Sequence, residues 1–225
     1  YYGQYHIFHS WNTAKEFHDY VIENLEMSYN HEPGKSLIGS FATHDDKSPM
    51  ANGGVPYCNM TTGLQATMPM LNPYIVTGFE SGDRYIYEYK DKTSPTSKTD
   101  CYEYIVHPEM VDIFNLSRAP GGEHPEIGQF MSSMMKTRQQ YEDVITKGSY
   151  IPLEVKGNKG DKIIAYARHY NGKTLLAIAN KDVNAKQSGT IKVPGLKSNQ
   201  VLKDLAPEYG IQSQYKPGEN TVQVE

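Results

Sequence analysis

The sequence predicts an α/β region followed by an all-β region. Up to about residue 148, segments with helical apolar spacing alternate with short, unbroken apolar runs. Beyond that point the apolar runs are short and separated by turn residues, and helical periodicity is absent. We therefore expect two domains: residues 1–148, containing a parallel sheet, and residues 149–225, forming an antiparallel β-sandwich.

The first predicted element is a helix over residues 13–28. Thr13 and Glu16 form a capping-box pattern at its start. Its apolar face comprises Ala14, Phe17, Val21 and Leu25. A strand is predicted over residues 36–42, because this run is apolar without alternation, which is typical of a strand buried on both faces of a parallel sheet.

A second helix and a second strand follow. The helix is predicted over residues 57–71 and is ended by Asn72-Pro73. The strand is predicted over residues 74–79 and is followed by two acids, Glu80 and Asp83. Both predicted strands therefore end in carboxylates, at the edge where α/β enzymes place their active sites.

A third helix is predicted over residues 125–147, with Gly148 as its stop. Two strands then come at residues 162–169 and 173–180, and Asn171-Gly172 between them is a strong hairpin signal. Shorter strands are predicted at residues 190–193, 200–202 and 221–224.

Composition limits the possible partners. The 225 residues carry a formal net charge of -4 without a basic cluster, so nucleic acid is not a favoured partner. No run approaches the roughly 18 to 20 apolar residues of a membrane span. Cys58 and Cys101 could pair or remain free thiols. The chain begins without methionine and stops within a predicted strand, so we expect it to be part of a longer protein.

The most informative motif is Thr43-His44-Asp45-Asp46, directly after the first predicted strand. Three interpretations are open. The side chains could cap the strand end, or they could bind a metal, although no further His, Cys or Asp cluster has ligand spacing. They could also supply one acid of a glycosidase pair, with Glu80 or Asp83 as the other.

The sequence resembles the C-terminal part of the α-amylase family of glycoside hydrolases and transglycosidases. The segment Ser36 to Asp46 resembles that family's seventh barrel strand with its Asn-His-Asp or Ser-His-Asp ending, and Met68 to Gly82 resembles the eighth strand. The helix that ends near Lys147 resembles the last barrel helix. Residues 165–180 resemble the opening hairpin of the C-terminal β domain. The resemblance implies an incomplete (β/α)8 barrel segment followed by an antiparallel β-sandwich.

The resemblance also implies roles for the motif. Asp45 would be the transition-state stabiliser that binds sugar hydroxyls, His44 would bind the same sugar, and Glu80 would be a supporting residue. Thr43 stands where the family usually has Asn or Ser. If the family's residue spacing is counted from Phe41 instead, Asp46 takes the place of Asp45 as the catalytic carboxylate that stabilises the transition state. The acid pair with Glu80 is less favoured on this basis.

The family's nucleophile and general acid belong to earlier strands, and no Gly-x-Arg-x-Asp motif occurs in the chain. The resemblance therefore implies the C-terminal part of a retaining enzyme acting on α-linked glucans, inactive without the N-terminal part of its barrel. The alternative is a non-catalytic amylase-like subunit that binds glucan or a partner. Calcium is a possible cofactor through the resemblance alone, and the sequence identifies no metal ligands.

Overall fold

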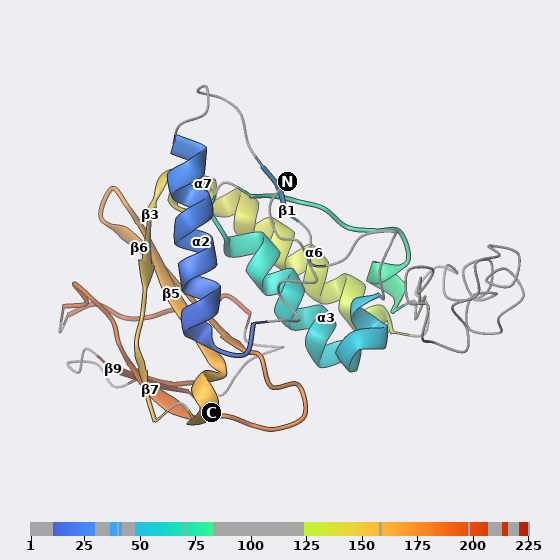
Figure 1. Ribbon diagram of the computed structural model, residues 1–225. Helices are drawn as coiled ribbons and strands as arrows, with labels where there is room; N and C mark the ends of the chain where they lie inside the picture. Colours follow the sequence, from blue (N-terminus) through green and yellow to red (C-terminus); the bar gives the residue numbers. More distant parts are fainter. Residues whose placement is uncertain are drawn as a thin grey trace, which may run out of the picture.

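The computed structural model describes residues 11–29, 37–39, 41, 48–69, 71–82, 124–157, 159–197, 199–206, 213–215 and 221–224 (Figure 1). Its helices are α2 (Ala14–Tyr29), α3 (Pro49–Thr67), α6 (Pro125–Gln140) and α7 (Glu142–Lys147), with 3-10 turns η1 (Phe79–Ser81) and η4 (Lys159–Asp161). Its strands are β1 (Leu37–Gly39), β2 (Leu71–Pro73), β3 (Ser149–Pro152), β4 (Val155–Lys156), β5 (Ile163–Tyr170), β6 (Lys173–Asn180), β7 (Gly189–Lys192), β8 (Ser213–Tyr215) and β9 (Thr221–Val224).

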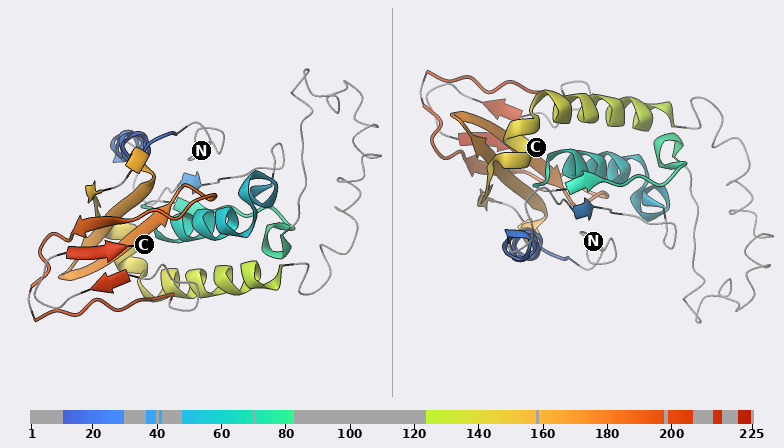
Figure 2. Two further views of the ribbon diagram at one scale, coloured as in Figure 1. Left: turned by 90° about the horizontal axis from the view of Figure 1, so that it is seen from below. Right: turned by 90° about the horizontal axis from the view of Figure 1, so that it is seen from above.

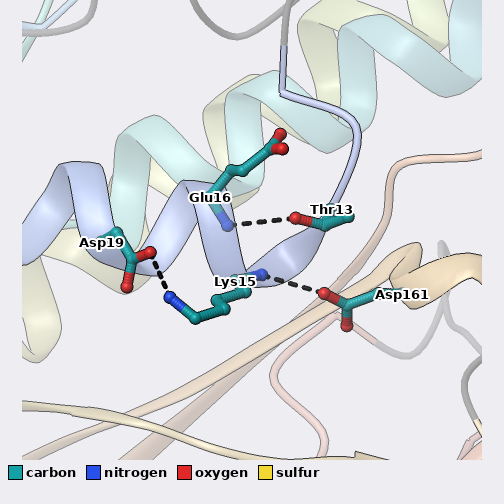
Figure 3. Close-up of polar contacts among 5 residues, drawn as sticks. All are labelled: Thr13, Lys15, Glu16, Asp19 and Asp161. Atoms are coloured by element: carbon teal, nitrogen blue, oxygen red, sulfur yellow. Dashed lines mark hydrogen bonds and ion pairs between the residues drawn. The ribbon is translucent and has the colours of Figure 1, made fainter.

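Helix α2 confirms the first predicted element, and Thr13 and Asp161 cap amides of its first turn (Figure 3). The backbone N–H of Glu16 donates to Thr13 Oγ1 at 3.2 Å, as the capping-box pattern predicts. The Glu16 carboxylate accepts in return from Asn12 N at 2.7 Å. A further cap comes from η4, where Asp161 Oδ2 accepts from Lys15 N at 3.0 Å.

The predicted helix over 57–71 is wrong at both ends. Helix α3 begins after Ser48, whose hydroxyl accepts from Ala51 N at 3.1 Å, and it kinks at Gly53 and Gly54. It ends at Thr67, because Pro69 follows the C-cap residue and cannot continue a helix.

The second strand also differs from its prediction. Strand β2 covers Leu71–Pro73 rather than residues 74–79, and it pairs in parallel with β1. Strand β1 lies inside the predicted range 36–42. The pairing therefore confirms a parallel arrangement but moves the second strand upstream.

The predicted long helix over 125–147 is divided at Tyr141, where φ is -112°. Gly148 ends the second part as predicted: its N–H donates to Val144 O at 3.2 Å. A Cβ at Gly148 would collide with that same carbonyl, so only glycine fits this junction. In Figure 2, α3 and α6 lie side by side in both views, on one side of the strands.

Two antiparallel sheets follow α7, with strand orders β3-β5-β6 and β4-β7-β9-β8. The β5–β6 hairpin turns at Asn171 and Gly172, whose φ values of 47° and 74° are those of the predicted turn. Strands β7 and β9 agree with predicted strands, but residues 200–202 form no strand.

Strand β5 is buried on both of its faces along most of its length. Ile164 and Tyr166 join a cluster with the apolar residues of α2 and α3. Ile163, Ala165 and Ala167 join a second cluster with residues from β7 and the segments around it. The helical region and the β region therefore share a core along this one strand.

Candidate active site

The four residues of the motif, Thr43 to Asp46, lie outside the described residues, as does Asp83. The roles of His44, Asp45 and Asp46 therefore stay predictions. The structure does describe the frame on either side of them. Strand β1 ends at Gly39 and is followed by the buried Phe41, and α3 begins after the buried Ser48.

The carboxyl ends of β1 and β2 lie at the same edge, because the strands are parallel. Tyr74, the residue after β2, donates its N–H to Gly39 O at 2.9 Å and to Gln65 Oε1 at 3.2 Å. Gln65 is buried on α3. The exit of β2 is thus fixed both to β1 and to the helix between the two strands.

Glu80 does not follow a strand directly, which corrects its predicted position. It lies in η1, seven residues after the end of β2 at Pro73. Gly78 and Gly82 flank η1 with φ values of 98° and 78°, which favour glycine. The exposed Glu80 carboxylate accepts from Gly78 N at 3.0 Å. This bond holds the carboxylate close to its own backbone.

The N-terminal turns of α6 pack directly against η1. A Cβ at Gly128 would lie 3.1 Å from Glu80 O, so this glycine allows the close approach. Gly82 lies against the ring of His124, which shares a hydrogen bond of 3.0 Å with Glu126. Backbone hydrogen bonding and the His124 ring hold the pKa of Glu126 below its ordinary value.

Arg138, near the end of α6, fixes the turn that leads into β2. Its guanidinium donates to Ala66 O at 2.9 Å and to Leu71 O at 2.5 Å. Burial lowers the pKa of Arg138 from its ordinary value. Neither Arg138 nor Gln65 was predicted from the sequence to have a role here. Arg138 lies in the last turn of a helix, where the helix dipole alone already favours a cation, so its position does not indicate a further role.

The remaining described His, Cys and acidic residues bear on whether the chain holds a metal site or a reactive thiol. Within the described ranges, no three His, Cys, Asp or Glu side chains gather as a metal site would require. Cys58 is a fully buried free thiol, and burial raises its pKa to about 12, so it stays protonated. Cys101 lies outside the described residues. None of the described helices is long and apolar enough to cross a bilayer.

No protein-family model matches the chain, and no curated protein matches it in sequence. Solved structures do match it in fold. A debranching enzyme from Nostoc punctiforme has a TM-score of 0.61 at 20% identity, over 94% of this chain and 37% of its own. Amy13B from Eubacterium rectale has a TM-score of 0.55 at 16% identity, over 94% of this chain and 41% of its own. A noncanonic maltogenic α-amylase, AmyB, from Thermotoga neapolitana has a TM-score of 0.56 at 14% identity, over 95% of this chain and 43% of its own.

The chain has an amylase-like fold. The resemblance found in the sequence is therefore confirmed at the level of fold. The chain spans about two-fifths of each of these three structures. Helices followed by antiparallel sheets agree with the predicted order of elements, while the barrel segment and the sandwich stay predictions.

Proposed function

We propose that the chain is the C-terminal part of an α-amylase-like enzyme that cleaves or transfers α-linked glucans by a retaining mechanism. The observation that carries this proposal is the amylase-like fold over 94% or more of the chain. In this proposal, residues 1–148 are the end of a (β/α)8 barrel and residues 149–225 are the β-sandwich behind it.

The pairing of β1 and β2 supports an incomplete barrel. Among the described strands, β1 and β2 are hydrogen-bonded only to each other and form a two-stranded sheet. Parallel strands are otherwise found in larger sheets that are covered on both faces. Further parallel strands from the N-terminal part of the barrel would complete this sheet, and that part is the partner we propose.

Asp45, with Asp46 as the alternative, is the proposed transition-state stabiliser, and His44 binds the same sugar. Such groups act by hydrogen bonding to hydroxyls as positive charge develops at the anomeric carbon. Glu80 supports this site from the turn that follows β2. Because nucleophile and general acid would lie upstream, the 225-residue chain alone should not turn over maltooligosaccharides.

The test is an assay of the protein that includes the upstream barrel strands, with maltoheptaose as substrate. We expect Asp45→Asn to lower kcat by about 10²- to 10³-fold, the range for losing one transition-state contact. Asp46→Asn is the matched control and should lower kcat far less. Glu80→Gln, which keeps an acceptor for Gly78 N, should also have a smaller effect.

NMR of the first product formed should show the α-anomer, since a retaining enzyme preserves configuration. A β-anomeric first product would contradict the mechanism. Turnover by the 225-residue chain alone would contradict the assignment of nucleophile and acid to the upstream part. A larger loss in Asp46→Asn than in Asp45→Asn would reverse the choice between these two residues.

One sequence observation favours a second function. Thr43 stands where the family usually has Asn or Ser, so the site could have lost catalysis and kept binding. In that case the longer protein would bind maltoheptaose or a partner subunit without turnover. Calorimetric binding together with no detectable product would establish this alternative.

A further inference from the structure

Helix α2 carries a buried histidine on the side that faces the β3-β5-β6 sheet. His18 is only 8% exposed. Its Nδ1 shares a hydrogen bond of 2.6 Å with the hydroxyl of Tyr150 on β3, 132 residues later in the chain. The His18 ring also lies near the ring of Phe17, with centroids 5.6 Å apart. This contact joins α2 to the sheet.

The second ring nitrogen of His18 has no such partner. Nε2 is buried and makes no hydrogen bond with any described residue. A neutral imidazole has one N–H and one acceptor nitrogen, and the Tyr150 hydroxyl can satisfy Nδ1 in either role. In the tautomer with its proton on Nδ1, Nε2 is only an unpaired acceptor, whereas an imidazolium always places a charged, unsatisfied N–H at this buried position. The site therefore fits the neutral ring better than the cation.

The charged and titratable groups around His18 do not reverse this preference. Asp19 on the same helix pairs with Lys15 Nζ, and Asp161 on η4 accepts from Lys15 N. Tyr150 on β3 and Tyr166 on β5 are close to each other, with ring centroids 5.0 Å apart. Burial lowers the pKa of His18 to about 4, although Asp161 and Asp19 act in the opposite direction.

We propose that His18 is a pH-dependent latch, which holds α2 on the β3-β5-β6 sheet when neutral and releases it when protonated. Release would reach beyond α2, because Phe17 shares its apolar cluster with Trp11 and with Phe41.

Hydrogen exchange of the whole protein, read peptide by peptide and corrected for intrinsic rates at each pH, tests the latch. Protection of the α2 amides should fall about 20-fold between pH 7 and pH 5, as linkage predicts for a histidine whose pKa is lowered from 6.5 to about 4 by burial under α2. Protection of the α6 amides should not follow this dependence, and α6 serves as the internal control.

The His18→Phe variant should keep α2 protected and remove its pH dependence, because an apolar ring fills the same site without a titrating group. His18→Leu provides a second apolar replacement if the larger ring does not fit. His169→Gln is the matched control, since this histidine is exposed on β5 and bonds to Thr174. Constant α2 protection across pH, or an unchanged dependence in His18→Phe, would overturn the proposal.

Discussion

The two faces of β5 are both buried, but they are built differently. Towards the helices the strand presents Ile164 and two large side chains with polar ends, Tyr166 and Arg168. Tyr166 Oη bonds to Thr67 Oγ1 at 2.7 Å, and Arg168 Nη2 donates to Ile145 O at 2.7 Å. Towards the second sheet it presents Ile163, Ala165 and Ala167, which have no polar side-chain atoms.

The difference shows how one strand can face two kinds of neighbour. Helices are curved and uneven surfaces, so long side chains with directed hydrogen bonds fix their positions on the strand. The second sheet packs closely along the strand, and purely apolar side chains, two of them alanine, allow it. We therefore expect the helix face to respond to lost volume and hydrogen bonds, and the sheet face to respond to added volume.

The largest expected effect comes from removing the main contact of the helix face. Tyr166→Ala should lower the free energy of unfolding by about 4 kcal/mol, since it leaves a cavity beside Phe17 and Tyr150. Urea unfolding followed by circular dichroism measures this loss. A loss below about 1 kcal/mol would mean that the helix face can close over the missing ring.

Acid should weaken the helix face next. The pKa of His18 is lowered from 6.5 to about 4 in the folded state. Its contribution is therefore complete above pH 6.5 and is lost as the pH falls towards 4, by about 3 kcal/mol in total. Urea midpoints between pH 7 and pH 4 measure the loss. The same slope in His18→Phe would assign it to other groups.

On the face of β5 that packs against the second sheet, added side-chain volume should lower the free energy of unfolding. Ala165→Leu places three extra carbon atoms in a fully buried site, and we expect a loss of about 2 kcal/mol. His169→Leu on the exposed end of the same strand should change stability by less than about 0.5 kcal/mol. Equal effects at the two positions would remove the distinction between the faces.

Among the changes at buried positions, the smallest effect should come from the loss of one hydroxyl. Tyr166→Phe should cost about 1 kcal/mol, because Thr67 Oγ1 still donates to Gly63 O at 2.7 Å and is not left unsatisfied. A double-mutant cycle with Thr67→Val isolates the pair. A coupling energy near zero would show that ring packing alone positions α3 on β5.

Local signals were sufficient where a few neighbouring residues determine the structure. Thr13 with Glu16 predicted the start of α2, and Asn171-Gly172 predicted the hairpin. Glycine and proline misled at α3 and β2. The helix was predicted to begin only at residue 57, but Gly53-Gly54 form a kink within α3. Pro73 suggested a helix end but completes a strand. The pairing of β2 with β1 determines the strand at Pro73, and local sequence preferences do not predict such a pairing.

The candidate site was less predictable than the fold. The sequence indicated Glu80 as a supporting residue, but it did not predict the turn between two left-handed glycines that positions it. Arg138 and Gln65 were missed because their hydrogen bonds go to backbone or to distant strands. Such partners are set by the packing of three elements and leave no spacing pattern in the sequence.

The cap that Asp161 provides for α2 has a consequence for synthesis of the chain. The carboxylate lies 146 residues after the amide of Lys15 that it accepts from. At about 5 to 20 residues per second, a ribosome reaches residue 161 roughly 7 to 30 s after it has added Lys15. During that interval α2 has its own Thr13 cap but neither Asp161 nor the sheet beneath it, so its apolar face is open to chaperones on the nascent chain.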